Sequence, residues 1–501
     1  MKHPDQPDYV VGVVGCGAMG QGIAQVSAQG GMRTLLYDAR EGAAQAARDR
    51  IAGFIGRAVE KGRMSQDDAD AAVARLEPVG DLQGLKPADT VVEAIFEDLE
   101  LKQQIFADLE GAVTPECILA SNTSSIPIAS IARACQQRAR VAGLHFFNPV
   151  PLMKLVEVIR PIGCDDQVIA NLMALGKRMT RVPVEVQDSP GFLVNMGGRA
   201  YTTEALRIVH EGVATPAQVD AIMRDCWGFR MGPFELMDLT GIDVNYPVSQ
   251  IIWEGYGYDP RLKTSPNHRA MFDAGLFGRK TGQGWYRYDD KGQMIDPPSA
   301  DFVTDAAPIK AVQTDSDAIA ALCEEIGIDI VKGAPRLETS EGRDCVHQST
   351  YDGTAPKPIV MLDLMGNTSK RITMMTPPAF DRTVGEGIAQ GVAAAIIASG
   401  RKVTWIKDSP GFVGQRMVAM VGNLGCYMAE VGLASPEDID TAMQLGLNYP
   451  RGSIALLEDI GVKRAYFLMT ALHDCILEER YRPTQWLARR SMLDLSLYTP
   501  N

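Results

Sequence analysis

The stretch Tyr9–Gly20, YVVGVVGCGAMG, decides the fold class, and a helical run from Gln21 to Gln29 follows it directly. It begins as a short apolar strand and ends as a GxGxxG turn. Glycines let the backbone approach a pyrophosphate, and the start of a helix offers unpaired N–H groups and the positive end of its dipole. This order of strand, glycine turn and helix predicts a dinucleotide-binding α/β domain of the Rossmann type. The candidate cofactor contacts in the turn are Gly15, Gly17, Ala18, Met19 and Gly20.

A second strand pattern, Arg33 to Tyr37, ends at Asp38. An acidic residue at this place in a Rossmann domain binds the hydroxyls of the adenine ribose and repels the 2′-phosphate of NADP. The sequence therefore favours NAD as the cofactor.

Two ionisable residues lie inside the apolar runs of Gly143–Ile159, GLHFFNPVPLMKLVEVI. His145 is in the first run and Glu157 in the second, and the prolines between them mark a turn. If the two strands lie side by side, the carboxylate fixes the tautomer of the imidazole and makes it a better proton acceptor. This pattern is typical of a general base. The alternative is a buried structural histidine with a glutamate at the rim of the core.

Polar residues, SNTSS, follow the strand pattern Cys117–Ala120. The carboxyl ends of parallel strands are where such sheets bind ligands, which makes Ser124 a candidate for hydrogen bonding to a substrate. A serine here can instead cap the helix that follows.

A long helical stretch, roughly Glu41 to Leu76, carries the basic residues Arg57, Lys61 and Arg63. These residues form either a solvated helix face or a patch that binds the phosphates of a large anionic substrate.

Length and composition limit the function classes. At 501 residues the chain is too long for one core, and its net charge of -13 argues against nucleic-acid binding. It has no run of 18 apolar residues that would span a membrane, and its first residues have no apolar signal core. Nine scattered cysteines without a CxxC pair indicate reduced thiols in the cytoplasm and no metal site.

An α-helical domain follows the sheet and recurs later in the chain. Asp188–Phe192, DSPGF, returns 220 residues on as Asp408–Phe412. At this offset, Asn195 corresponds to Gln415. The positions 220 residues after Ser124, His145 and Glu157 hold Asp344, Met365 and Pro377, so no second His–Glu pair is expected there. The predicted domains are 1–188 (nucleotide-binding), 189–288 (helical), 289–405 (a linker or a reduced remnant of a nucleotide domain) and 406–501 (a second, non-catalytic helical copy).

Seven segments in this order resemble the L-3-hydroxyacyl-CoA dehydrogenases: VGVVGCGAMGQGIAQ, VVEAIFEDLELK, ASNTSSIPI, GLHFFNPVPLMKLVEVI, DSPGFLVN, GPFELMDLTGID and FGRKTGQGWY. The resemblance implies an NAD-binding Rossmann domain followed by helical C-terminal domains in tandem. It also implies that His145 is the base, that Glu157 is its partner, and that Ser124 and Asn195 hydrogen-bond the reacting oxygen. The residues it places against NAD are Asp38, Glu97, Lys102, Asn148 and Lys280, and Arg57 and Lys61 are the candidates for binding CoA.

The two helical domains resemble those of longer bacterial members of the family. The tail segments GLNYPRGSIALLEDIG and EERYRP resemble the phenylacetate-degradation type, which acts on 3-hydroxyadipyl-CoA or short 3-hydroxyacyl-CoA. Because single-copy relatives are dimers, the resemblance implies that the two copies pack within one chain, with further association into a homo-oligomer left open. The competing functions are a dehydrogenase of a free hydroxy or sugar acid, and a non-catalytic NAD-binding or lens-like protein.

Overall fold

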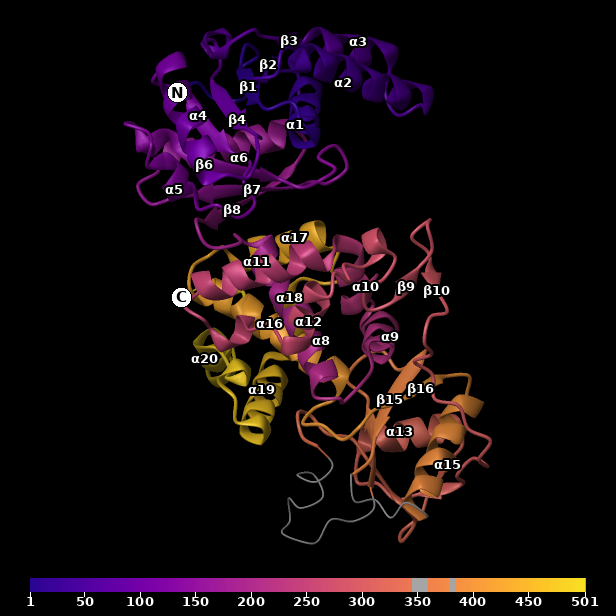
Figure 1. Ribbon diagram of the computed structural model, residues 1–501. Helices are drawn as coiled ribbons and strands as arrows, with labels where there is room; N and C mark the ends of the chain where they lie inside the picture. The colour runs from indigo at the N-terminus through magenta and orange to yellow at the C-terminus, as the bar shows by residue number, and fades with distance from the viewer. Residues whose placement is uncertain (345–358, 378–383, 501) are drawn as a thin grey trace. The chain divides into compact units, whose positions relative to one another are not determined.

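The computed structural model describes residues 1–344, 359–377 and 384–500. These residues form two compact units (Figure 1). The first consists of Met1–Met196 together with Val431–Leu447, and the second of Gly197–Glu430 together with Asn448–Asn501. The chain therefore contributes two separate segments to each unit.

The first unit is built on a sheet of eight strands in the order β3-β2-β1-β4-β5-β6-β7-β8. All neighbours are parallel except β6 and β7, which are antiparallel. The strands are β1 (Val10–Val14), β2 (Arg33–Tyr37), β3 (Leu76–Pro78), β4 (Thr90–Glu93), β5 (Ile118–Ser121), β6 (Val141–Phe146), β7 (Leu155–Arg160) and β8 (Val182–Gln187). The helices are α1 (Ala18–Gln29), α2 (Ala43–Glu60), α3 (Gln66–Ala74), α4 (Leu99–Ala112), α5 (Ile128–Ala132) and α6 (Asp166–Arg178).

The turn after β1 requires glycine at two places. Gly15 has φ +95°, and a Cβ on it would lie 2.6 Å from the carbonyl oxygen of Ala94. A Cβ on Gly20 would lie 1.8 Å from the carbonyl oxygen of Gly15. The glycines therefore let α1 start directly above the end of β1.

The long helical stretch predicted over Glu41–Leu76 consists of two helices in the structure, α2 and α3. Gly62 between them has φ +65°, which ends α2. The Oγ of Ser65 then accepts a hydrogen bond from the backbone N of Asp68 at 3.1 Å and caps α3.

One helix that lies late in the sequence belongs to the first unit. This helix, α17 (Pro436–Leu447), contacts β7 and β8. Ahead of it, the carbonyl oxygen of Leu433 accepts a hydrogen bond from the backbone N of Gln187 at 2.9 Å. The end of the sheet at β8 is therefore covered by residues that follow it by more than two hundred positions.

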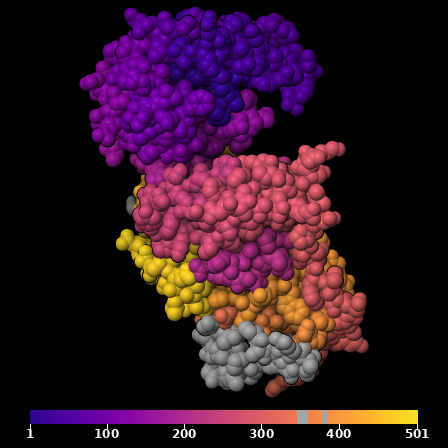
Figure 2. All heavy atoms as spheres, viewed as in Figure 1, coloured from indigo at the N-terminus to yellow at the C-terminus, as the bar shows by residue number. Residues whose placement is uncertain are grey.

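The second unit is mainly helical. Its early helices are α8 (Arg199–His210), α9 (Pro216–Trp227), α10 (Pro233–Thr240), α11 (Ile242–Gly255) and α12 (Pro266–Asp273), after the short α7 (Val194–Gly197). Its late helices are α16 (Val413–Glu430), α18 (Ser453–Ile460), α19 (Val462–Ile476) and α20 (Gln485–Leu493). In the space-filling view, the segment around residues 240–290 and the magenta segment that includes α8 and α9 lie side by side on one face (Figure 2).

A small sheet with its own buried core lies in the same unit. Its strand order is β13-β14-β15-β16, and only β14 and β15 are antiparallel. The elements are α13 (Asp317–Ile326), β13 (Arg336–Glu338), β14 (Ile359–Asp363), β15 (Arg371–Met375), α15 (Val384–Ala398) and β16 (Lys402–Trp405). Two short strand pairs also belong to this unit: β9 (Arg287–Tyr288) with β10 (Met294–Ile295), and β11 (Ala311–Val312) with β12 (Asp329–Ile330).

Within the described ranges, no helix combines the length and the apolar character that crossing a membrane requires. The same part of the chain contains no cluster of three or more His, Cys, Asp or Glu side chains arranged to hold a metal ion.

Candidate active site and cofactor cleft

His145 and Glu157 stand directly opposite each other on the antiparallel strands β6 and β7. Nδ1 of His145 lies 2.6 Å from Oε2 of Glu157, and both side chains are buried. The other carboxylate oxygen of Glu157 accepts hydrogen bonds from the backbone N of Leu193 at 3.1 Å and of Val194 at 2.8 Å. A carboxylate fixed in this way holds the imidazole in one orientation and leaves Nε2 as the nitrogen not engaged by Glu157.

The loop after β5 brings Ser124 next to Asn195. The side-chain amide of Asn195 donates to the carbonyl oxygen of Ser124 at 3.3 Å, and Ser124 is exposed. The same loop is fixed to the histidine strand, because Oδ1 of Asn122 accepts from the backbone N of Phe146 at 2.8 Å. Asn122 was not singled out from the sequence, although it stands in the quoted SNTSS segment.

Glu97 holds the loop that carries Ser124. Its Oε1 accepts hydrogen bonds from the hydroxyl of Thr123 at 2.6 Å and from the backbone N of Ser124 at 3.1 Å and of Ser125 at 3.2 Å. Burial acts to raise the pKa of Glu97, but the Thr123 hydroxyl and the Lys102 charge outweigh it and lower the pKa. An ionised Glu97 therefore keeps the loop in place.

Lys102 is buried rather than open to the cofactor cleft. Its side chain is 1% exposed, and its Nζ lies 2.6 Å from Oε1 of Glu93 and 3.4 Å from Oε2 of Glu97. The remaining oxygen of Glu93 accepts from the hydroxyl of Ser121 at 2.6 Å. Glu93 was missed by the sequence reasoning, because it reads as the last residue of an apolar strand.

A cavity of about 400 Å³ lies at the carboxyl ends of β1 and β2. Its lining combines the glycine turn with apolar side chains and two charged residues, among them Gly15, Ala18, Met19, Asp38, Arg40 and Ile105. No side chain caps the first turn of α1, and a Cβ at Gly17 would meet nothing within 4 Å. The free amides and the open space fit the pyrophosphate of NAD, and the apolar wall fits an adenine.

Asp38 directly follows β2 and lines this cavity. Its Oδ2 accepts a hydrogen bond from the backbone N of Cys16 at 2.8 Å, so the carboxylate is fixed to the glycine turn. The side chain of Arg40 hydrogen-bonds it and lowers its pKa to about 2. Asp38 is therefore anionic at neutral pH, as recognition of ribose hydroxyls requires.

A second cavity of about 600 Å³ lies beside α1 and α2. Arg50 and Phe54 line it, and so do Gln21 and Asn148. The expected basic residues Arg57, Lys61 and Arg63 are all exposed and do not line the cavity, although the Arg57 guanidinium lies 4.6 Å from the centre of the Phe54 ring. Arg50 and Phe54 were missed, although positions 50, 54 and 57 have the spacing of one helix face.

Lys280, which the resemblance implies is a cofactor contact, belongs to the second unit. There its Nζ lies 2.6 Å from Oδ1 of Asp243.

Comparisons with known proteins agree over almost the whole chain. The profile of the 3-hydroxyacyl-CoA dehydrogenase NAD-binding domain matches residues 10–189, and that of the family's C-terminal domain matches residues 191–288 and 411–494. The 3-hydroxyadipyl-CoA dehydrogenase of Escherichia coli K12 is 35% identical over 97% of this chain and 98% of its own length. A probable 3-hydroxybutyryl-CoA dehydrogenase of Bacillus subtilis is 38% identical but covers 56% of this chain and 97% of its own.

A solved structure of similar extent is described as 3-hydroxybutyryl-CoA dehydrogenase from Escherichia coli K12. It has a TM-score of 0.85 and 34% identity, and the match covers 97% of this chain and 98% of that one. The matching profiles cover more than half of the residues, and they coincide with the glycine turn and the His145–Glu157 pair described above. The chain therefore belongs to the 3-hydroxyacyl-CoA dehydrogenase family of NAD-dependent oxidoreductases.

Proposed function

We propose that the chain oxidises (S)-3-hydroxyacyl-CoA to 3-ketoacyl-CoA, with His145 as the general base. Bound NAD supplies the hydride acceptor. Nε2 of His145 takes the proton of the 3-hydroxyl group, and Glu157 stabilises the imidazolium that forms. The observation that carries this role is the 2.6 Å contact between Nδ1 and the buried carboxylate, which orients the free nitrogen.

Ser124 and Asn195 are proposed to orient the substrate oxygen and to stabilise the charge that develops on it. Both residues belong to the first unit, and the hydrogen bond from the Asn195 side chain to the Ser124 carbonyl oxygen holds them next to each other. Polar donors held in a fixed place stabilise a developing oxyanion without having to reorganise during the reaction. Glu97 supports this arrangement by fixing the Ser124 loop.

The second cavity is the proposed binding place for the CoA part of the substrate. Arg50 provides a cation on its wall, and Phe54 provides an exposed ring that is backed by Arg57. An aromatic ring and a guanidinium suit an adenine and a phosphate, respectively. Arg57 and Lys61 remain candidates for the outer phosphate contacts.

The proposed substrate is 3-hydroxyadipyl-CoA, with 3-hydroxybutyryl-CoA second. The support comes from the E. coli relative named for the first, whose match covers 97% of this chain and 98% of its own length. We place the reaction in the cytoplasm, within fatty-acid or aromatic (phenylacetate) degradation. The test is NADH oxidation by the purified protein with acetoacetyl-CoA, longer 3-ketoacyl-CoAs and a carboxylated 3-ketoacyl-CoA. A higher kcat/KM for long unbranched chains than for the carboxylated one would reject the assignment.

The chain is also proposed to contain two copies of the same two-domain arrangement. The strands β13–β16 pair parallel, antiparallel, parallel, which is the pattern of β5–β8. A helix joins the last two strands in each set, α6 in one and α15 in the other, and a DSPGF segment follows both. On this view residues 289–405 hold a reduced nucleotide domain rather than a linker, between the helical domains 189–288 and 406–501.

Strand register supports a correspondence between two positions of the proposed second copy and the pair His145 and Glu157. Glu157 lies opposite His145 and beside Val184, four residues before DSPGF. Thr373 lies opposite Asp363 and beside Thr404, which also stands four residues before its DSPGF. Asp363 and Thr373 thus take the places of His145 and Glu157, and a constant offset of 220, which gave Met365 and Pro377, misplaces them.

Gln415 supports the same correspondence. Its amide nitrogen donates to the carbonyl oxygen of Ser340 at 2.8 Å, much as Asn195 binds the loop after β5. It also donates to Oδ1 of Asp363 at 3.1 Å. Gln415 and Asp363 are thus engaged with each other and not with an open site, so the second copy is proposed to be structural and without catalysis.

The two helical copies are proposed to pack as a pseudo-dimer within one chain. Helix α16 contacts α8, and the buried Arg416 lies 2.8 Å from the buried Glu204. Replacing Arg416 by Met should lower the free energy of unfolding by about 3–5 kcal/mol, because it leaves Glu204 without that cation. A loss below about 1 kcal/mol in urea unfolding would contradict a packed interface.

A further inference from the structure

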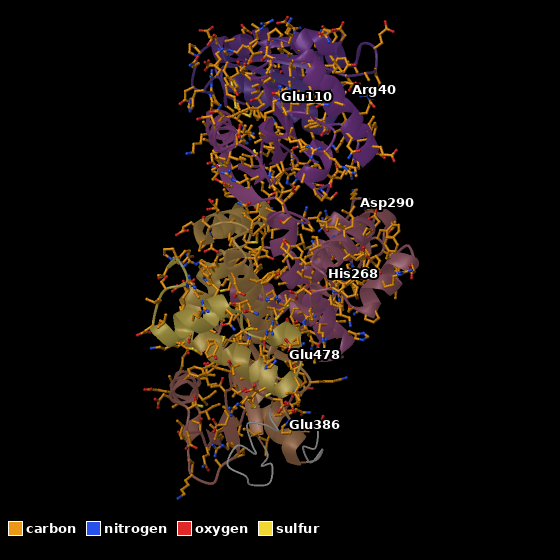
Figure 3. All side chains as sticks on the ribbon, turned by 90° about the vertical axis from the view of Figure 1, so that its left-hand side faces the viewer. Arg40, Glu110, His268, Asp290, Glu386 and Glu478 are labelled. Atoms are coloured by element: carbon orange, nitrogen blue, oxygen red, sulfur yellow. The ribbon has the colours of Figure 1, made fainter. Side chains whose placement is uncertain are left out.

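Asp38 and Arg40 form a two-bond ion pair at the cofactor cavity. Nε of Arg40 donates to Oδ1 of Asp38 at 3.0 Å, and Nη2 donates to Oδ2 at 3.1 Å. The Asp38 side chain is 9% exposed, whereas that of Arg40 is 72% exposed. Figure 3 labels Arg40 at the outside of the first unit, and both residues line the cavity that fits the adenosine half of NAD.

The Asp38 carboxylate therefore has four donors even without a ribose. Besides the two side-chain bonds, the backbone N of Arg40 donates to Oδ1 at 3.0 Å and that of Cys16 to Oδ2 at 2.8 Å. A carboxylate offers about four acceptor positions. Ribose hydroxyls that bind Asp38 must consequently share or replace the bonds from Arg40.

The pair also changes the charge that a cofactor meets. A lone carboxylate at the end of the second strand repels a 2′-phosphate, and a nearby arginine accommodates one. This chain has both groups in contact, and Nη1 of Arg40 takes no part in the pair. The guanidinium can therefore bind an oxyanion through that edge while it still neutralises Asp38.

We propose that Arg40 is a specificity-determining residue for the cofactor and that it weakens the rejection of NADP by Asp38. The preference for NAD is then a property of the pair and not of Asp38 alone. This inference deepens the cofactor role given above to Asp38 and rests on it.

The test measures dissociation constants by fluorescence titration of the full-length protein with NADH and with NADPH. In Arg40→Ala, the dissociation constant for NADPH divided by that for NADH should rise about tenfold, because one charge-assisted hydrogen bond to the 2′-phosphate is lost. NADH itself should bind equally or more tightly, because its ribose no longer competes with a guanidinium. Asp38→Ser should lower the ratio, since it frees Arg40 for the 2′-phosphate.

The double variant Asp38→Ser/Arg40→Ala separates the two residues. It should lose the gain in NADPH affinity that Asp38→Ser shows, which is the mark of a coupled pair. Arg33→Ala is the matched control: Arg33 begins the same strand, and its Nη2 lies 2.7 Å from Oε2 of Glu77, away from the cavity. The ratio of the NADPH to the NADH dissociation constant in Arg33→Ala should equal that of the unmodified protein.

Two results would overturn the inference: an unchanged ratio in Arg40→Ala, or a double variant that binds NADPH as tightly as Asp38→Ser does. These results leave the role of Asp38 intact if Asp38→Ser still shifts the ratio. Failure of the unmodified protein to bind NADH would instead reject the cofactor assignment itself.

Discussion

Nδ1 of His145 lies 2.6 Å from Oε2 of Glu157 because the antiparallel register of β6 and β7 sets the two residues directly opposite each other. Cross-strand neighbours on one face of a sheet have their Cβ atoms about 5 Å apart, a distance that an imidazole and a glutamate can bridge. Two further backbone bonds fix the carboxylate. The proposed general base is thus positioned by the sheet rather than by a loop.

Removing either member of this pair should stop the chemistry without removing the cofactor. His145→Ala and Glu157→Gln should each lower kcat by about 10²–10⁴-fold, the usual contribution of a general base. NADH binding, followed by fluorescence, should stay within about threefold of the unmodified protein, because neither residue lines the adenosine cavity. In the double variant the losses should not multiply, since the two residues act as a unit. Multiplying losses would exclude a coupled pair.

Asn195 and Gln415 provide a matched comparison between the two proposed copies. Asn195→Ala should lower kcat by about 10²–10³-fold, as loss of one donor to a developing oxyanion does. Gln415→Ala should leave kcat unchanged and lower only the free energy of unfolding, because its bonds go to Ser340 and Asp363. Steady-state kinetics and urea unfolding on both variants distinguish these roles. A loss of kcat in Gln415→Ala would show that the second copy takes part in catalysis.

The buried pair of Glu93 and Lys102 should be essential for the stability of the first unit. Glu93→Gln leaves the Lys102 ammonium, 1% exposed, without its nearest carboxylate, and should lower the free energy of unfolding by about 3–5 kcal/mol. Glu77→Gln is the control, because Glu77 and Arg33 form a half-exposed pair. That change should lower stability by less than about 1 kcal/mol. Equal losses in urea unfolding would contradict the importance of burial.

Asp363 should make stability depend on pH. Burial raises its pKa to about 6, above the value of about 3.9 that it has when unfolded. The folded state therefore binds the Asp363 proton more tightly than the unfolded state does. The stabilisation that this proton contributes is fully present below about pH 3.9 and is lost as the pH rises through about 6. An asparagine at position 363 keeps the Oδ1 oxygen, which accepts hydrogen bonds from the backbone N of Met365 and from Nε2 of Gln415.

Between pH 5 and pH 8, Asp363→Asn should accordingly gain stability relative to the unmodified protein, on the order of 1–3 kcal/mol. Urea unfolding of both proteins at the two pH values measures this difference. If the difference in free energy of unfolding between the two proteins were the same at both pH values, the carboxyl group would be solvated in the native state.

The pairing of His145 with Glu157 can be anticipated because strands show their pairing in local composition. His145 and Glu157 each stand in a short apolar run, and the prolines between them allow little besides a tight connection. Asp38 was equally accessible, since it follows a strand at a fixed distance from a glycine turn. These features depend on residues that are neighbours in the sequence. In the structure, His145 and Glu157 lie on paired strands and Asp38 directly follows β2, as the local patterns indicate.

Other features depend on contacts between distant segments, which a local pattern does not contain. The position of Lys102 early in a helix suggests exposure, and only the approach of Glu93 from β4 explains its burial. In the proposed second copy, the segments that connect the strands differ in length from those of the first, so a constant offset of 220 residues does not point to Asp363 and Thr373. Register, which is a property of paired strands, identifies them.

The position of α17 has a consequence for how the chain can be divided. Residues 431–447 complete a unit that otherwise ends at residue 196, so the polypeptide passes from one unit to the other three times. During synthesis, the edge of the sheet at β8 stays uncovered until the ribosome has added residues 197–430 of the second unit. No single cut separates the two units, and an expression fragment that stops after residue 196 or 288 lacks a helix of the nucleotide-binding unit. Gene fusions and shortened forms of this protein should therefore keep the chain whole through Leu447.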